Sequence, residues 1–133
     1  MTQVNVGGVT AKPDGLITRE AKRDLSSYQY HAMKIDTDGL ADYVDTSSAG
    51  PVMGILQNAP DAAGGEAEIA TEGTSLAVIG NTVAEGDKLG SNSDYHLVPV
   101  TSDKSIYFAI AMDEGVTTEV IEVKLVGEQN ISV

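Results

Sequence analysis

The chain of 133 residues contains no cysteine and no tryptophan, and one phenylalanine and five tyrosines are its only aromatic residues. Without thiols it can form neither disulfides nor thiolate metal sites. Its longest apolar run, residues 106–112, is far shorter than the roughly 18 residues that a membrane-spanning helix requires. The N-terminal residues 1–10 lack the basic and apolar stretches of a secretory signal. We therefore expect one soluble domain with a core of Val, Ile, Leu, Ala and Met.

Basic residues are also scarce, since 8 Lys and Arg against 20 Asp and Glu give a net charge of −12. Residues 1–34 carry five basic and three acidic groups, a net charge of +2, whereas residues 35–133 carry three basic and seventeen acidic groups, a net charge of −14. Such an acidic body repels phosphate backbones, so we expect no nucleic-acid partner. The mildly basic N-terminal part suits an acidic protein surface. Alternatively, the acidic charge of the body serves only solubility.

The chain contains a weak internal repeat with an offset of 54 residues. Residues 34–35 correspond to 88–89, and residues 68–73 correspond to 122–127. A repeat of short strands without an embedded catalytic group is typical of a scaffold or a binding module. We predict one β domain over residues 28–133, with pseudo-repeats at 34–73 and 88–127.

Alternation of apolar and polar residues predicts strands along most of this domain. Turns are expected at Asp36–Gly39, at Asn58–Gly65 and at residues 113–115, where Asp, Asn, Pro and Gly gather. Pro99 suits an edge strand. The expected strands are residues 28–33, 52–56, 66–72, 76–79, 97–100, 106–112 and 120–126. About eight short strands predict an all-β fold, either a small β-sandwich or a partly closed β-barrel.

Residues 1–27 are predicted to be an extended N-terminal arm with one short helix. Glycines and Pro13 favour extended chain up to residue 15, and Thr18 is a candidate N-cap for a helix over Glu20–Leu25. One interpretation is a frayed terminus with a capping helix. The other is an arm that adds a strand to an exposed sheet edge of a partner. Its candidate contact residues are Leu16, Ile17, Arg19, Lys22 and Arg23.

The strand expected at residues 106–112 has two unlike faces. One face carries the large side chains of Ile106, Phe108 and Met112, together with Ile110. The other carries Ala109 and Ala111, which are small enough for another sheet or subunit to approach closely. We therefore predict Ala109 and Ala111 to lie at a subunit interface.

The sequence contains no convincing metal site. Asp36, Asp38, Asp42 and Asp45 are spaced roughly like calcium ligands, but an EF-hand requires its glycine at the sixth position and a glutamate at the twelfth, and here Gly39 comes too early. An Asp-Gly hairpin turn explains the pattern better. His31 and His96 lie far apart in a chain without thiols, and we interpret them as surface residues of strands.

Catalytic motifs are absent as well. The chain has no Gly-x-Ser-x-Gly elbow, no phosphate-binding glycine loop and no His-Glu-x-x-His sequence. Glu66 and Glu68 form a carboxylate pair of the kind that glycosidases use, but they alternate along a hydrophilic strand face without an apolar pocket to raise a pKa. We predict a protein without enzymatic activity and without a cofactor.

Three runs carry a family resemblance: PVMGILQNAP at residues 51–60, GEAEIATEG at 65–73, and VAEGDKL at 83–89 with a polar turn and Val98–Val100 behind it. They resemble the small head-decoration, or capsid cement, proteins of tailed bacteriophages, over about residues 28–127. Similar Glu-Gly-Asp turns occur in carriers of biotin and lipoyl groups. Those domains need a lysine at the tip of a hairpin, a position that neither Lys88 nor Lys124 occupies.

The resemblance implies a homotrimer, made in the host cytoplasm, on the outer capsid surface of the virion. Its N-terminal arms would reach neighbouring copies of the major capsid protein, and no nucleic acid or membrane would be bound. The expected function is non-enzymatic bridging of major capsid subunits, which stabilises the expanded shell. The alternative is a carbohydrate- or host-surface-binding β-sandwich on the virion, with Tyr43, Tyr95 and Tyr107 as candidate sugar platforms.

Overall fold

The computed structural model describes residues 11–44, 52–91, 96–101 and 106–130. Within these ranges every regular element is a strand, which confirms the all-β prediction, and no helix is present that could cross a membrane. The strands are β1 (Pro13–Glu20), β2 (Ala32–Ile35), β3 (Ala41–Tyr43), β4 (Gly54–Leu56), β5 (Glu66–Val78), β6 (Lys88–Ser91), β7 (Leu97–Pro99), β8 (Ile106–Ala111) and β9 (Val120–Asn130).

All of these strands belong to one antiparallel sheet that curls into a half-barrel, with the order β3-β2-β4-β5-β9-β8-β6-β7. The partly closed barrel is therefore the better of the two predicted architectures. Strand pairing follows the same scheme on both sides of the central β5–β9 contact, because β2 pairs with β3 and β4 as β6 pairs with β7 and β8. β1 stands outside this path and pairs with β5. β7 is the last strand in the order, as Pro99 predicted.

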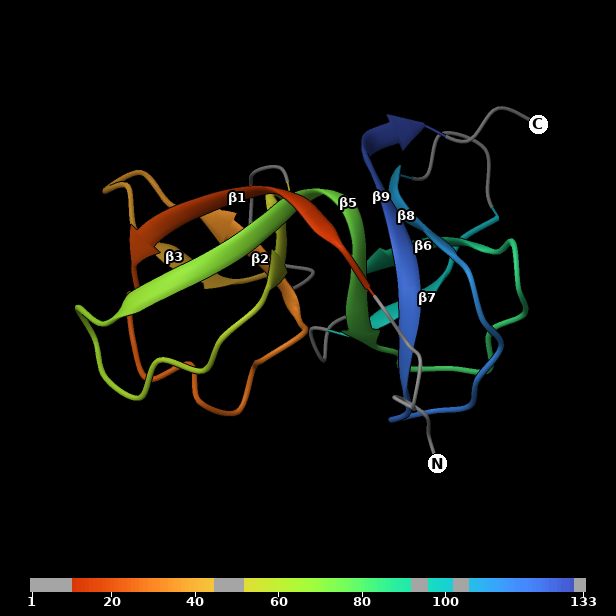
Figure 1. Ribbon diagram of the computed structural model, residues 1–133, viewed down its shortest axis with the longest axis horizontal. Coiled ribbons are helices and arrows are strands. Elements are labelled where there is room, and N and C mark those ends of the chain that lie inside the picture. The colour runs from red at the N-terminus through yellow and green to blue at the C-terminus, as the bar shows by residue number, and fades with distance from the viewer. Residues whose placement is uncertain (1–10, 45–51, 92–95, 102–105, 131–133) are drawn as a thin grey trace.

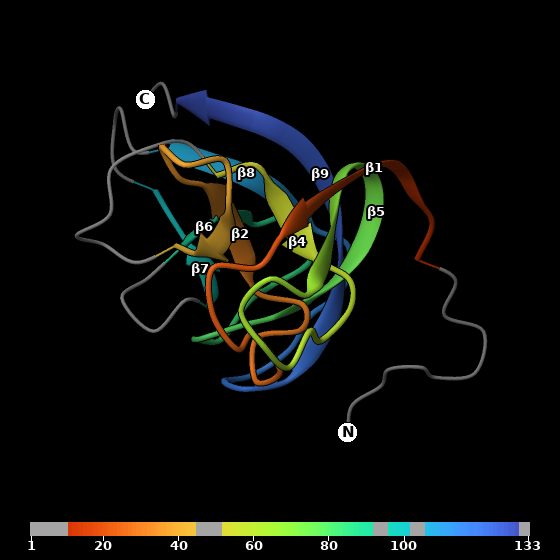
Figure 2. The same ribbon diagram turned by 90° about the vertical axis from the view of Figure 1, so that its left-hand side faces the viewer.

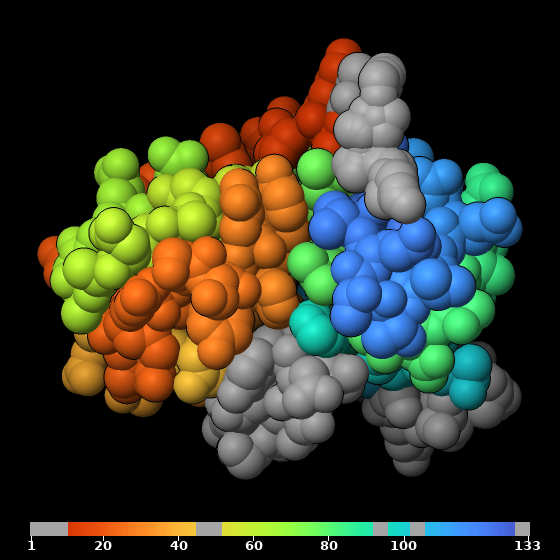
Figure 3. All heavy atoms as spheres, turned by 90° about the horizontal axis from the view of Figure 1, so that it is seen from below, coloured from red at the N-terminus to blue at the C-terminus, as the bar shows by residue number. Residues whose placement is uncertain are grey.

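The long strand β5 connects the two halves of the molecule (Figure 1). Its first half contributes Ile69 to a small core cluster with Leu25, Met33 and Leu56. Its second half contributes Ala77 to a larger cluster around Phe108. The two strands expected at residues 66–72 and 76–79 are thus one bent strand. The two halves pack side by side, as the space-filling view from below shows (Figure 3).

The predicted short helix is wrong. Thr18 and Glu20 are strand residues of β1, and Ala21 forms a bridge with Ala41. A helix of one or two turns gains little from its own hydrogen bonds. Pairing with β5 instead satisfies the backbone and leads the chain into the small core cluster, where Ala21 and Leu25 are 1% and 0% exposed. Of the predicted arm, residues 1–10 lie outside the described ranges.

Both faces of β8 contribute to the core. The alanines face the core, with Ala109 at 0% and Ala111 at 2% exposure, whereas Ile106 is 50% exposed. Phe108, which points to the other face, is buried as well, at 3% exposure. The register shift between Tyr107 and Ala109 places extra residues in β9, because two steps along β8 correspond to four along β9.

Candidate interaction surface

β1 is an edge strand on the outside of β5 (Figures 1 and 2). Its pairing with β5 sets Ile17 opposite Ile69 and Glu20 opposite Glu66. The amide of Ala21 donates to the carbonyl oxygen of Gly65 at 2.7 Å. Because backbone groups alternate in direction along an antiparallel strand, those of Leu16, Thr18 and Glu20 point away from β5. Directly after Glu20 this outer side meets β3, because Ala21 forms a parallel bridge with Ala41 and the amide of Lys22 donates to the carbonyl oxygen of Ala41 at 2.9 Å.

The start of β1 passes very close to the backbone of β5 at Gly73. A Cβ atom placed on Gly73 would lie 2.5 Å from the carbonyl oxygen of Lys12 and 2.7 Å from the amide nitrogen of Asp14. The amide of Lys12 donates to Oγ1 of Thr74 at 2.7 Å. The φ angle of Gly73 is +83°, in the left-handed region that glycine adopts most easily. Glycine is thus required here for two separate reasons.

Arg23 joins the chain behind β1 to β3. Its Nε and Nη2 donate to the two carboxylate oxygens of Asp42 at 2.9 and 3.0 Å, and its guanidinium lies 4.8 Å from the ring centre of Tyr43. The hydrogen bond to Asp42 raises the pKa of Arg23. Asp42 is only 5% exposed, and its Oδ1 also accepts from the amide of Tyr43. This buried carboxylate is therefore both neutralised and hydrogen-bonded.

Lys22 makes a second ion pair. Its Nζ lies 2.9 Å from Oδ2 of Asp36, and the resulting hydrogen bond raises the pKa of Lys22. Asp36 also accepts hydrogen bonds from the amides of Asp38 and Leu40, and chiefly the Leu40 bond lowers its pKa. The carboxylates considered as calcium ligands thus form a turn and ion pairs. No group of three potential ligands occurs in the described residues, and Asp45 lies outside them.

The structure places the five predicted contact residues along one continuous segment. Leu16 and Arg19 are exposed on β1, and Leu16 is 56% exposed. Ile17 packs against the small core cluster. Lys22 and Arg23 are held by their carboxylate partners within the chain. Their contact with a capsid subunit stays a prediction, in which Leu16 and Arg19 are the most accessible members.

Ala109 and Ala111 lie elsewhere, in the larger core cluster. Both are covered by the chain itself, at 0% and 2% exposure, because their side chains pack inside that cluster. Their role at a subunit interface stays a prediction, and it would need contact through the side chains that cover them.

The two histidines, distant in sequence, lie together in the fold. Their ring centres are 5.0 Å apart, and His31 also lies edge-on to Tyr28 at 5.4 Å. His31 is 8% exposed, so the prediction of a surface residue is wrong for it. Burial lowers the pKa of His31, and the neighbouring His96 lowers it further, while a hydrogen bond from Nδ1 to the carbonyl oxygen of Gln29 opposes the shift. The sequence around His31 and the sequence around His96 contain no feature that indicates this contact between the two halves.

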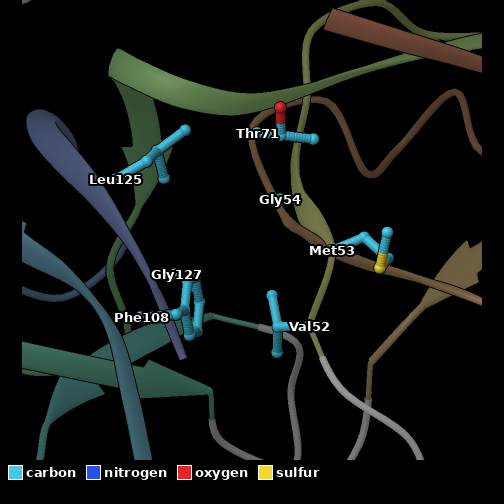
Figure 4. Close-up of a pocket in the computed structure, with 7 residues that line it drawn as sticks. All are labelled: Val52, Met53, Gly54, Thr71, Phe108, Leu125 and Gly127. Carbon is cyan, nitrogen blue, oxygen red and sulfur yellow. The ribbon is translucent and has the colours of Figure 1, made fainter. Parts of the chain in front are cut away.

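A small hollow lies where the two halves meet (Figure 4). It is lined by Val52, Met53, Gly54, Thr71, Phe108, Leu125 and Gly127. Its volume of about 10 Å³ is close to that of a single water site, far below the ~300 Å³ of small-molecule pockets. The hollow is therefore too small to be a ligand site, and the exposed strand β1 remains the best candidate for interaction.

Comparison with known proteins adds a fold relationship. No family model matches the chain, and no curated protein is similar to it in sequence. The fold is that of a phage head protein of known structure. One similar structure is the N base of head fiber gp8.5 in bacteriophage phi29, with a TM-score of 0.57 and 15% sequence identity over 84% of this chain and 92% of that chain. At this identity the likeness shows a shared fold.

Proposed function

We propose that this chain is a structural protein of a bacteriophage head, without catalytic activity, that binds the outer surface of the capsid. The observation that carries the proposal is the fold likeness to the base of a phage head fiber, which extends over 84% of this chain. The resemblance of residues 28–127 to capsid cement proteins points to the same particle independently. The partner is the major capsid protein, and the bound chain bridges neighbouring capsid subunits.

The surface chemistry supports a protein partner. The net charge of −12 disfavours contact with packaged nucleic acid. The sugar-binding alternative gains no support from the described tyrosines, because Arg23 covers the ring of Tyr43 and Lys88 lies 5.3 Å from the ring centre of Tyr107. Tyr95 lies outside the described residues. A sugar platform needs an open aromatic face, and a cation lies over one face of each of these two rings.

Binding would stabilise the expanded shell by mass action. A ligand that binds only one state of a shell stabilises that state by about 2.7 kcal/mol when its concentration is 100 times the dissociation constant. In the homotrimer that the resemblance implies, three weak contacts would act together. We propose that Leu16 and Arg19 on β1 make part of each contact, since they are exposed on a strand that the sheet holds in place.

The test is co-sedimentation of the chain with expanded, DNA-free heads. We expect the wild type to pellet at a fixed ratio to capsid subunits, and Arg19→Glu to pellet less. Lys124→Glu is the matched control, because it makes the same charge change at an exposed position on β9. A truncation should end at residue 10, since removing residues 1–25 would delete β1 and part of the core. If the wild type does not pellet with heads, the proposed function is wrong.

A further inference from the structure

The only two histidines of the chain meet at the joint between its two halves. His31 lies directly before β2 and His96 directly before β7, and their ring centres are 5.0 Å apart. Next to His31, the amide of Val78 donates to the carbonyl oxygen of Tyr30 at 3.1 Å, a backbone contact from one half to the other. The fold therefore brings both imidazoles to one place, although they are distant in sequence.

The separation of the two rings fits a shared metal ion. Imidazole nitrogens bind Zn²⁺ at about 2.0–2.1 Å, so two rings on one tetrahedral ion have centres roughly 5 Å apart. The rings of His31 and His96 have this separation, and their planes are inclined by 41°. Rotation of the side chains alone can bring one nitrogen of each ring to a common ion.

His31 already makes the additional contact that metal-binding histidines usually have. Its Nδ1 lies 3.1 Å from the carbonyl oxygen of Gln29. Because a carbonyl oxygen only accepts, Nδ1 of the neutral ring carries the proton, and Nε2 has the lone pair that a metal ion needs. Tyr28 lies edge-on to the same ring at 5.4 Å. These contacts select the tautomer and orient the ring before an ion binds.

The turn that contains His31 does not itself require a histidine. In the second half, the amide of Asp87 donates to the carbonyl oxygen of Ala84 at 3.1 Å. In the first half, the amide of His31 donates to the carbonyl oxygen of Tyr28 at 3.0 Å in the same way. The carboxylate of Asp87 also accepts from the amide of Ala84 at 2.9 Å, which closes the turn. The ring of His31 instead meets His96, so this contact explains the histidine better than the turn does.

We propose that His31 and His96 together bind one divalent transition-metal ion of the class that imidazole ligands prefer, such as Zn²⁺. No group of three potential ligands occurs in the parts of the chain that the structure describes, so water molecules complete the coordination. Because each half supplies one ligand, the bound ion links the halves and stabilises the folded chain. The site requires only this chain and is independent of capsid binding.

The test is calorimetric titration of the full, metal-free chain with zinc chloride at about pH 7.5, where imidazole is neutral. About 10 mM magnesium is kept in the buffer, because it occupies carboxylate sites of the acidic body but not imidazoles. We expect one zinc ion per chain and a higher urea midpoint with zinc. His31→Gln and His96→Gln should each weaken zinc binding roughly tenfold or more. Glu114→Gln, which removes an exposed carboxylate, is the control and should leave binding unchanged.

A second measurement needs no variant. In the NMR spectrum of the wild type, the ring signals of both histidines should shift together as zinc is added. Urea unfolding without zinc shows whether each variant retains the fold. A wild type that binds no zinc, or zinc binding that survives either histidine substitution, would overturn the proposal. Two ions per chain, one lost with each histidine, would overturn it as well, because the rings would then bind separately.

Discussion

Gly73 and Gly127 form a natural matched pair for testing how tightly β1 is held. They lie 54 residues apart at equivalent positions of β5 and β9, and both have positive φ, +83° and +71°. A Cβ atom on Gly73 would meet the backbone of Lys12 and Asp14 at 2.5 and 2.7 Å, whereas nothing lies within 4 Å of a Cβ atom on Gly127. Substitution by alanine therefore imposes a similar backbone strain at both sites, and a steric clash at Gly73 alone.

The expected losses in free energy of unfolding follow from the backbone strain and the steric clash. A left-handed conformation of a residue with Cβ costs about 1–2 kcal/mol, so Gly127→Ala should lower the free energy of unfolding by that amount. Overpacking against a backbone that cannot yield costs a further 1–3 kcal/mol, roughly. Gly73→Ala should therefore destabilise the chain by about 2–5 kcal/mol.

Equilibrium urea unfolding measures both values, and hydrogen exchange shows where the loss occurs. We expect faster exchange of the Ile17 and Arg19 amides in Gly73→Ala and no change there in Gly127→Ala, because only the former displaces β1. Equal destabilisation by the two substitutions, with β1 protected in both, would refute the close packing of β1 on β5.

Three other perturbations test the described contacts. Burial lowers the pKa of His31 below 6.5, so the unfolded chain binds more protons than the folded chain as pH falls. The free energy of unfolding should therefore decrease from about pH 7 towards pH 5, and it should decrease less in His31→Gln. Urea unfolding midpoints at each pH measure both changes. Arg23→Ala removes two hydrogen bonds from the carboxylate of Asp42 and should cost about 1–3 kcal/mol in thermal or urea unfolding. Lys22→Ala should cost less, because Asp36 keeps the hydrogen bonds from the amides of Asp38 and Leu40, and equal losses would contradict this difference. Ala109→Trp should prevent folding, seen as loss of cooperative unfolding, and a folded, stable variant would contradict the 0% exposure of this residue.

Local patterns predicted much of the β domain. The turn at Asp36–Gly39 is confirmed, since the amide of Gly39 donates to the carbonyl oxygen of Asp36 and its φ is +80°. The alternation along β9 is confirmed too, with Ile121, Val123 and Leu125 buried. Such features depend on neighbours in sequence, because turn chemistry and period-two burial are local properties.

The errors occurred where distant segments compete with local preference. The residues predicted to form a helix after Thr18 instead form the end of β1 and its connection. Pairing with the edge of β5 and burial in the small core cluster stabilise this segment more than one or two helical turns would. That Ala109 and Ala111 are covered within the chain depends on the curled sheet, in which they join the larger core cluster. Neither the edge of β5 nor this packing is visible in a single stretch of sequence.

The amino-acid sequence by itself determined the all-β class, the positions of the main turns and strands, and the acidic character of the body, because each of these depends on composition or on residues adjacent in the chain. Only the tertiary structure decided that β1 pairs with β5, that Lys22 and Arg23 bind Asp36 and Asp42, and that His31 meets His96. These contacts join segments that are distant in the sequence, and they form only when the sheet curls and brings those segments together.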